Sequence, residues 1–216
     1  MDVVKNARKV PEKILLGPGP TPVESRILRA MAEPTLGHLD RDFVSLMDET
    51  RDLLRFVFQT KNDLTVAMSG TGSAGMETAC VNMIERGDKV IVCAHGVFGT
   101  RMQDVAERCG AEVVQVNAPM GKPVDPEDVR KALMAHPDAK LLGIVHAETS
   151  TGVLQPLDEI ASMVHGAGMF MVVDAVTSLG GMDVPVDRLD LDMVYSGSQK
   201  CLACPPGLAP VTVGPK

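Results

Sequence analysis

A glycine-rich turn, Ser69-Gly70-Thr71-Gly72-Ser73-Ala74-Gly75, lies between a short apolar run and a segment with helical spacing. The free N–H groups at the N-terminus of a helix point outward, and the helix dipole favours an anion at that end. Thr71, Gly72 and Ser73 are therefore candidates to hold a phosphate group.

Two other interpretations of this turn stay open. Gly70, Gly72 and Gly75 match the G-x-G-x-x-G pattern of dinucleotide-binding folds. That fold also needs an acidic residue about 20 positions further on, at the end of the next strand. The next apolar run leads into Ala94-His95, where no acidic residue stands, so the second part of the dinucleotide pattern is missing. The third interpretation is a plain tight turn without a ligand.

Asp174 and Lys200 each follow a short apolar run that predicts a buried strand. A carboxylate at the end of a buried strand needs a cationic or protonated partner. Lys200 closes the segment Ser196-Gly197-Ser198-Gln199-Lys200, so its amine is expected near the same edge of the sheet. Taken alone, a strand-end aspartate is more often a cap or turn residue, and a lone lysine is usually solvated surface.

The phosphate cradle, the aspartate and the lysine together suit one cofactor, pyridoxal 5'-phosphate. The lysine would form a Schiff base with the cofactor aldehyde. The aspartate would pair with the pyridinium nitrogen and keep it protonated, which makes the ring an electron sink. The turn at 69–75 would take the phosphate.

Three further side chains follow predicted strands and are candidates for the same site. Thr149 lies in the hydroxyl-rich segment 146–152 and either reaches the cofactor or caps a turn. Phe98, in a turn between glycines, either stacks on a planar ring or packs as core at a helix start. His146 is as easily a satisfied core histidine as a functional one.

Alternating strands and helices must position these residues. We expect helices at Val23–Ala32 and from about Asp40 to Phe58, and further helices near 74–85, 98–108, 126–135 and 157–165. Between these segments, short apolar runs predict strands at Leu64–Met68, Val90–Cys93, Val113–Val116, Leu141–Val145, Met169–Val173, Met193–Tyr195 and Leu208–Val213.

This alternation predicts an α/β fold with three layers, α/β/α, around a mostly parallel central sheet. In such sheets, ligands bind beyond the carboxyl ends of the strands, which is where the candidate residues stand. Residues 1–21 are expected to form an extended N-terminal arm that ends in a turn rich in glycine and proline.

Composition excludes several classes of function. The net charge of −7 argues against bulk electrostatic binding to nucleic acid. The absence of Trp and the presence of a single Tyr argue against base-stacking platforms. No apolar run reaches the roughly 18 residues of a membrane span, and the first residues lack the apolar stretch of a secretory signal.

Five cysteines, an odd number, favour reduced thiols and a cytoplasmic location over a disulfide framework. Cys201 and Cys204 have the spacing of a redox or zinc pair. No second pair of this kind exists, and Pro205 and Pro206 follow where a thioredoxin-like motif would place a helix. We therefore expect structural thiols and no metal site.

The sequence resembles the class V, fold-type I aminotransferases, and within them the alanine–glyoxylate and serine–glyoxylate group. The matching stretches run in the family's order along nearly the whole chain: LLGPGPTPV (15–23), GHLDRDF (37–43), SGTGSAGMETA (69–79), HGVFGTR (95–101), HAETSTGVLQPLD (146–158), VVDAVTSLGG (172–181) and YSGSQKCLACPPG (195–207). The resemblance implies the large domain of a pyridoxal-phosphate-dependent transferase.

Carried over by position, the resemblance makes Lys200 the Schiff-base lysine and Asp174 the partner of the pyridinium nitrogen. Thr71, Gly72 and Ser73 become the phosphate cradle, with Gln199 beside it. Phe98 takes the position that stacks on the cofactor ring, and Thr149 the position of a hydroxyl directed at its O3′ atom. Related cysteine desulfurases have histidines at the stacking position and just before the lysine, so Phe98 and Gln199 disfavour that branch.

The implied reaction is transamination between an amino donor of the alanine or serine type and a small keto acid such as glyoxylate or pyruvate. Lys200, once released from the Schiff base, would move the proton from the substrate carbon to the cofactor. The alternatives are another fold-type I activity, such as a lyase or desulfurase, or an inactive fragment that only binds cofactor.

Members of this family usually have nearly twice this length. We therefore expect residues 22–216 to be the cofactor-binding large domain and the C-terminal small domain to be absent from this chain. The resemblance also implies a homodimer with its active sites at the subunit interface.

Overall fold

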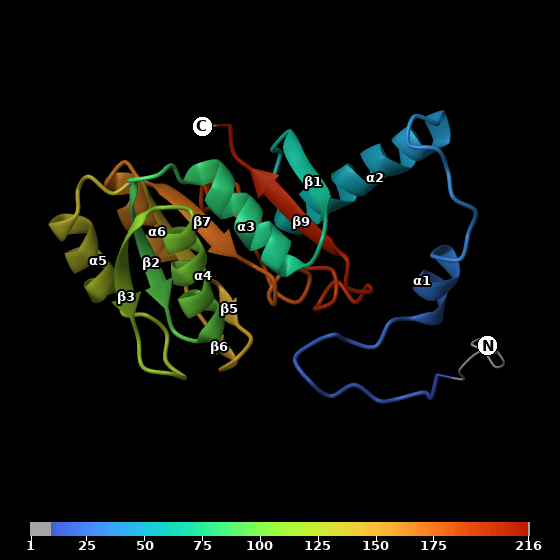
Figure 1. Ribbon diagram of the computed structural model, residues 1–216, viewed down its shortest axis with the longest axis horizontal. Coiled ribbons are helices and arrows are strands. Elements are labelled where there is room, and N and C mark those ends of the chain that lie inside the picture. Colours follow the sequence, from blue (N-terminus) through green and yellow to red (C-terminus); the bar gives the residue numbers. More distant parts are fainter. Residues whose placement is uncertain (1–9, 216) are drawn as a thin grey trace, which may run out of the picture.

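The computed structural model describes residues 10–215, which form a three-layer α/β unit with an N-terminal extension (Figure 1). The helices are α1 (Ser25–Ala30), α2 (Arg41–Phe58), α3 (Gly72–Met83), α4 (Val97–Arg108), α5 (Pro126–Ala135) and α6 (Asp158–Gly166). The strands are β1 (Leu64–Ser69), β2 (Lys89–Ala94), β3 (Glu112–Asn117), β4 (Leu141–Val145), β5 (Ala147–Glu148), β6 (Val153–Leu154), β7 (Phe170–Asp174), β8 (Met193–Tyr195) and β9 (Leu208–Val213).

Seven of these strands form one sheet in the order β1-β9-β8-β7-β4-β2-β3. Within it, β8, β7, β4, β2 and β3 pair in parallel, and β9 runs antiparallel to both β8 and β1. The predicted mostly parallel sheet is confirmed. Because only β9 is reversed, the carboxyl ends of the other six strands lie at one edge.

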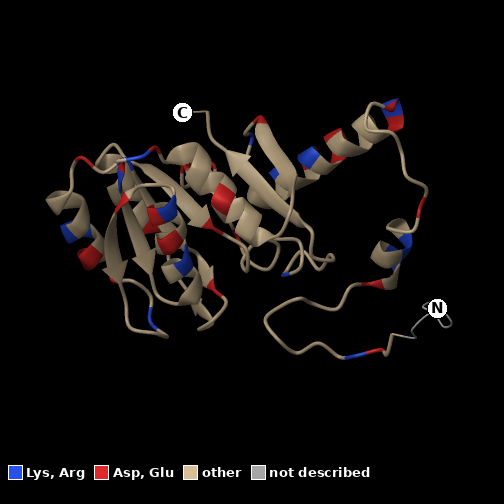
Figure 2. Cartoon of the chain, in the orientation of Figure 1, with Lys and Arg blue, Asp and Glu red and all other residues tan. Residues whose placement is uncertain are grey.

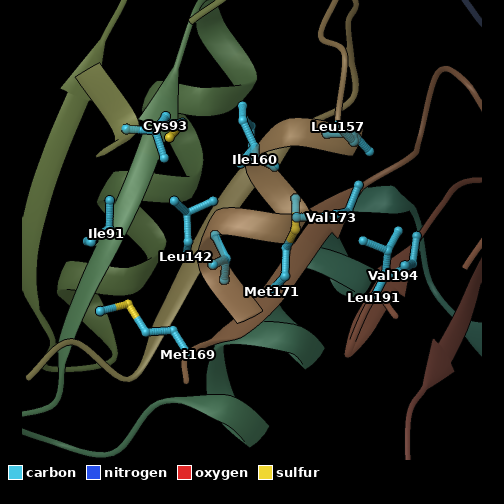
Figure 3. Close-up of a cluster of buried hydrophobic side chains, with 14 of the residues drawn as sticks. Ile91, Cys93, Leu142, Leu157, Ile160, Met169, Met171, Val173, Leu191 and Val194 are labelled. Atoms are coloured by element: carbon cyan, nitrogen blue, oxygen red, sulfur yellow. The ribbon is translucent and has the colours of Figure 1, made fainter. Parts of the chain in front are cut away.

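Two cores cover the two faces of the sheet. On one face, Ile91, Leu142 and Met171 pack with α5, α6 and the C-terminal end of α2 (Figure 3). On the other face, Val90, Val92 and further strand residues pack with α3 and α4. Neighbouring residues of a strand point to opposite faces, so both faces are buried only because the strands are apolar throughout.

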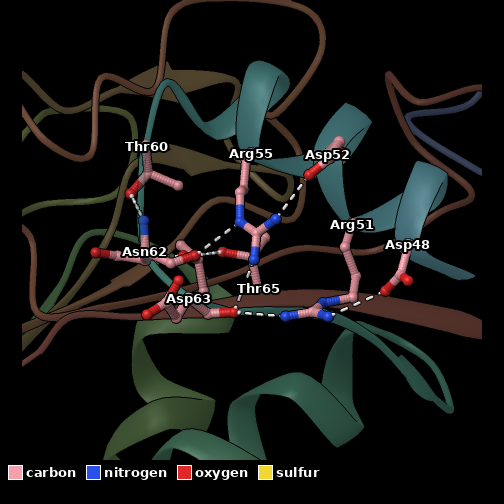
Figure 4. Close-up of polar contacts among 9 residues, drawn as sticks. Asp48, Arg51, Asp52, Arg55, Thr60, Asn62, Asp63 and Thr65 are labelled. Atoms are coloured by element: carbon pink, nitrogen blue, oxygen red, sulfur yellow. Dashed lines mark hydrogen bonds and ion pairs between the residues drawn. The ribbon is translucent and has the colours of Figure 1, made fainter.

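The helix Asp40–Phe58 predicted from the sequence is confirmed as α2, and Asp40 accepts a hydrogen bond from the N–H of Asp42 as its N-cap. Arg51 and Arg55 donate to the carbonyl groups of Asn62 and Asp63 at distances of 3.0 Å (Figure 4). These contacts fix the end of α2 to the turn before β1.

The structure corrects several predicted boundaries. The helix predicted at Val23–Ala32 is shorter, and none of its residues is buried, so no core extends it. The helix predicted from residue 74 begins at Gly72, so Thr71 precedes it as the N-cap residue, and Gly72 and Ser73 lie in its first turn. The strand that precedes Asp174 includes it. The small hairpin of β5 and β6 was not predicted, since two-residue strands leave no periodic signal.

The described part of the predicted arm, residues 10–21, contains no helix or strand and is mostly exposed, whereas residues 1–9 lie outside the described part of the chain. Within residues 10–215, no helix has both the length and the apolar character to cross a membrane.

Candidate active site

One cavity at the carboxyl edge of the sheet brings the predicted site residues together. It encloses about 500 Å³ of empty space, including its open mouth. Its lining contains all eight residues singled out from the sequence, which are Thr71, Gly72, Ser73, Phe98, Thr149, Asp174, Gln199 and Lys200. They come from five separate segments of the chain, so only the folded sheet makes them neighbours.

The N-terminus of α3 forms one wall of this cavity. Thr71 is the residue before the helix, and its carbonyl accepts hydrogen bonds from Ala74 and Gly75. The N–H groups of Gly72 and Ser73 lie in the first turn, where no preceding helical carbonyl can accept from them. A Cβ atom at position 72 would come within 2.8 Å of Val176, so glycine lets the helix start approach the strand ends closely.

An unsatisfied polar atom lies beside this wall. The side-chain oxygen of Gln199 is buried and has no hydrogen-bond partner among the described residues. Gly197 also lies close to Gly72, because a Cβ atom at position 197 would come within 3.5 Å of its Cα. The Gln199 oxygen is an acceptor, so it needs a donor. A phosphate group accepts hydrogen bonds and carries negative charge, so it fits the free N–H groups, the hydroxyls and the Nε2 hydrogens of the Gln199 amide.

Asp174 is buried, with 3% of its surface exposed, at the end of β7. Its Oδ1 atom accepts a hydrogen bond from the N–H of Val176 at 2.8 Å, and its Oδ2 atom accepts one from the Tyr195 hydroxyl at 2.9 Å. Burial nevertheless raises the pKa of the Asp174 carboxyl to about 6. A carboxylate in this position is poised to bind a cation.

Lys200 extends into the same cavity from the loop after β8. Burial lowers the pKa of its amine, and the charge of Asp174 acts in the opposite direction. The Nζ atom donates a hydrogen bond to the carbonyl of Pro18 at 2.9 Å. The Lys200 amine is thus partly desolvated, and the Asp174 carboxylate is close enough to influence it. These are the two groups that the proposed cofactor needs.

The N-terminal segment Gly17–Thr21 forms a strap over Lys200. The N–H of Thr21 donates to the carbonyl of Gln199 at 3.0 Å, and its hydroxyl donates to the carbonyl of Lys200 at 3.1 Å. A Cβ atom at Gly19 would lie 2.5 Å from the Cδ atom of Lys200. Segments almost 180 residues apart thus meet at the amine.

Phe98 and Thr149 complete the lining. Phe98 lies in the first turn of α4 and is half-buried, packed beside the core of that face while also reaching the cavity. The Thr149 hydroxyl makes a short hydrogen bond with the Thr177 hydroxyl.

His146 and the cysteine pair have partners of their own. Nδ1 of His146 forms a hydrogen bond of 2.9 Å with the Ser178 hydroxyl, and this histidine is not part of the cavity lining. The Cys201 and Cys204 thiols are free and donate to the carbonyls of Thr177 and Leu202. The interpretation of His146 as a satisfied core histidine is therefore the better one.

Two contributions to the site were missed from the sequence. Tyr195 supports Asp174, and the carbonyl of Pro18 accepts from Lys200. The Tyr195 contact had a signal, because the one tyrosine of the chain ends a buried strand and its hydroxyl needs a partner there. The strap had no such signal, because local sequence does not reveal a contact over so long a separation.

Comparison with known proteins identifies the family of the chain. The model of the family Aminotransferase class-V matches residues 20–215. The alanine–glyoxylate aminotransferase of Rattus norvegicus is 40% identical over 207 residues, which cover 96% of this chain and 50% of that protein. The (S)-ureidoglycine–glyoxylate transaminase of Bacillus subtilis is 39% identical over 203 residues, which cover 94% of this chain and 48% of that protein.

A solved structure gives the same result for the fold. The crystal structure of an alanine–glyoxylate aminotransferase from Nostoc sp. superposes with a TM-score of 0.96 and 44% sequence identity, covering 99% of this chain and 56% of that one. The chain spans about half the length of the curated relatives it matches. Since the family model extends along nearly all of the described residues, the chain belongs to the class-V aminotransferase family.

Proposed function

We propose that this chain binds pyridoxal 5'-phosphate in the cavity at the carboxyl edge of the sheet and serves amino-group transfer between small amino and keto acids. One observation carries the proposal. The Lys200 amine, the Asp174 carboxylate and the first turn of α3 line the same cavity. Class-V aminotransferases use this cofactor, which supports the assignment.

The residues present fit the three parts of the cofactor. The N–H groups of Gly72 and Ser73, with the hydroxyls of Thr71 and Ser73 and the Gln199 amide, would hold the phosphate. Asp174 would pair with the protonated ring nitrogen, Phe98 would stack on the ring, and Thr149 would face the ring hydroxyl. When bound, the cofactor supplies an aldehyde that takes up an amino group and a ring that withdraws electrons.

Lys200 has two functions in this proposal. It attaches the cofactor covalently through its amine, and it later moves a proton at the α-carbon of the substrate. Both need the neutral amine, and burial lowers the pKa of Lys200 in the direction that makes it available. The hydrogen bond to the Pro18 carbonyl restricts where the amine can point.

The substrate class follows from the relatives. They are alanine–glyoxylate and ureidoglycine–glyoxylate aminotransferases, so we propose a donor of the alanine or serine type and glyoxylate or pyruvate as acceptor. A lyase or desulfurase activity is less well supported, because these relatives are transaminases and neither Phe98 nor Gln199 is a histidine.

The assembly that we propose is a homodimer with active sites at its interface. Large apolar side chains are exposed along α1 and α2, which lie to one side of the sheet in Figure 1, and a second copy would cover them. Residues 22–216 would form the cofactor-binding large domain and residues 1–21 its arm. The free cysteines support a reducing location such as the cytoplasm.

The test is a half-reaction with the cofactor-loaded chain. Mixed with L-alanine, it is expected to release pyruvate in an amount equal to the bound cofactor, and the absorbance of the aldehyde form should disappear. Lys200→Ala is expected to release none. If alanine, serine and other small donors all leave the aldehyde form unchanged, the proposed function is wrong.

A further inference from the structure

The carboxylate of Glu148 is the most densely hydrogen-bonded acidic group near the cavity, although it does not line it. Its side chain is 1% exposed. Oε2 accepts from the N–H of Phe98 at 3.1 Å and from that of Gly99 at 3.2 Å. Oε1 accepts from the N–H of Ser150 at 3.1 Å and from its hydroxyl at 2.7 Å.

These donors come from two different elements. Phe98 and Gly99 belong to the first turn of α4, whereas Ser150 belongs to the turn that follows β5. Ser150 also accepts a hydrogen bond from the N–H of Val97 at 3.0 Å. A single buried carboxylate therefore connects the start of α4 to the segment 147–150.

The side chain of Glu148 packs directly against the backbone of Gly96. A Cβ atom at Gly96 would lie 2.2 Å from Cγ of Glu148 and 2.5 Å from its Cδ. A negative charge at the N-terminus of a twelve-residue helix is favourable, and donors surround both oxygens. A buried carboxylate is costly without such partners, so its position is strongly determined.

Two residues of the cavity lining depend on this connection. The N–H of Phe98 donates directly to Glu148. Thr149 lies in the chain between Glu148 and Ser150, and Ser150 is hydrogen-bonded to Glu148. Phe98 and Thr149 both line the cavity.

We propose that Glu148 is a positioning residue, which fixes Phe98 at the cavity wall and thereby sets the affinity for the cofactor ring. The inference rests on the proposed function, because the ring that Phe98 stacks on is that of pyridoxal 5'-phosphate. Glu148 touches neither the cofactor nor the substrate and acts through the backbone of α4.

A double-mutant cycle tests this inference. The dissociation constant of pyridoxal 5'-phosphate is measured by absorbance titration for the chain, Glu148→Gln, Phe98→Ala and the double variant. Glu148→Gln places amide hydrogens against N–H donors and is expected to weaken binding by about tenfold. In the Phe98→Ala background, the same change is expected to weaken binding by less than about threefold.

Further variants separate positioning from general stability. Ser150→Ala removes one donor to Glu148, leaves the carboxylate in place and is expected to weaken binding by about threefold. Gln155→Ala is the matched control, because Gln155 is equally buried but holds Val124, away from the cavity. It is expected to lower the melting temperature without changing the cofactor affinity.

Hydrogen exchange in the cofactor-free chain measures independently how firmly Glu148 holds the start of α4. Glu148→Gln is expected to speed exchange at the amides of Phe98 and Gly99 while leaving β4 and β7 protected. If the cycle shows no coupling between Glu148 and Phe98, or if both Glu148→Gln and Ser150→Ala bind cofactor as the unchanged chain does, the inference is wrong. An unchanged chain that binds no cofactor would instead refute the proposed function.

Discussion

Asp174 carries an electrostatic cost that a bound cation would relieve. Its carboxyl is held by two hydrogen bonds, yet burial raises its pKa from 3.8 to about 6. The folded chain therefore binds this proton more tightly than the unfolded chain does. Between pH 4 and 6, this group makes the fold less stable as the pH rises, and above pH 6 the full cost is present.

We therefore expect Asp174→Asn to stabilise the cofactor-free chain at pH 7 while it removes transaminase activity. The gain in the free energy of unfolding should be on the order of 1–3 kcal/mol, since no buried charge is left. Thermal unfolding measures it. At pH 4 the difference should shrink, because Asp174 is then protonated in the folded chain; a variant less stable than the unchanged chain at pH 7 would contradict this account.

The same carboxyl predicts how cofactor binding depends on pH. Below pH 6, Asp174 becomes neutral and can no longer attract a protonated ring nitrogen. The ratio of the affinity of the unchanged chain to that of Asp174→Asn should therefore fall as the pH is lowered through about 6. Titrations at matched pH values measure this ratio, and using the ratio removes the titration of the free cofactor. A constant ratio would show that Asp174 does not pair with the ring.

The sequence predicted most of the residues that line the candidate site. Asp174 and Lys200 were identified because Asp174 follows an apolar run and Lys200 lies in the loop after another. A charged side chain at the end of a buried strand needs a partner, so both residues are candidates for a functional role. Tyr195 and Glu148 were not assigned functions, because their contacts are made to residues 21 and about 50 positions away. The buried hydroxyl of Tyr195 indicates that a partner is needed, but the identity of that partner becomes visible only in the fold, as do the contacts of Glu148 to α4.

Among the elements, the strap Gly17–Thr21 is the one whose position matters most for Lys200. Gly19 has φ +128° and no room for a Cβ atom beside the lysine side chain. Gly17 has nothing within 4 Å of its Cβ position, so it is a matched control.

Gly19→Ala is expected to displace the strap and to slow covalent attachment of the cofactor to Lys200 by about tenfold. This corresponds to an activation free energy that is higher by about 1.4 kcal/mol. Gly17→Ala is expected to leave the rate unchanged. The rate of appearance of the visible absorbance band after cofactor addition measures both variants. Equal rates for the two would mean that the strap does not position the amine.

Strands whose residues are apolar throughout were predicted at the correct positions. β4, β7 and β8 are buried on both faces, and their apolar runs gave their positions to within one residue. β1 lies at the edge of the sheet, pairs with the antiparallel β9 and is partly exposed, yet its predicted range Leu64–Met68 is also correct to within one residue. Pairing order and strand direction depend on tertiary packing, which an apolar run alone does not specify.

For the whole molecule, the distribution of apolar and charged surface points to an assembly. Charges of both signs are interspersed along α4 and α5 (Figure 2), as on an ordinary solvated surface. Several large apolar side chains of α2 are exposed instead, among them Leu46, Leu53 and Phe56, and Phe56 has 81% of its surface exposed. In a folded chain, such a helix is typical of a buried interface between subunits.

Phe56→Ser is therefore expected to raise the dissociation constant of the proposed homodimer by at least tenfold, as loss of a buried aromatic side chain does at interfaces. Met134→Ser is the control, because Met134 is 77% exposed on α5, on the other side of the molecule. Sedimentation measurements over a range of protein concentrations give the dimer dissociation constant of both variants. A chain that is monomeric at all concentrations, or a Phe56→Ser variant that still forms the same dimer, would refute this interface.

The most direct test of the account is to locate the covalent bond to the cofactor. The chain is mixed with pyridoxal 5'-phosphate, reduced with borohydride, digested and analysed by peptide mass spectrometry. We expect the reduced cofactor on Lys200, and no fixed cofactor in Lys200→Ala. Attachment spread over exposed lysines, with Lys200 unmodified, would contradict it.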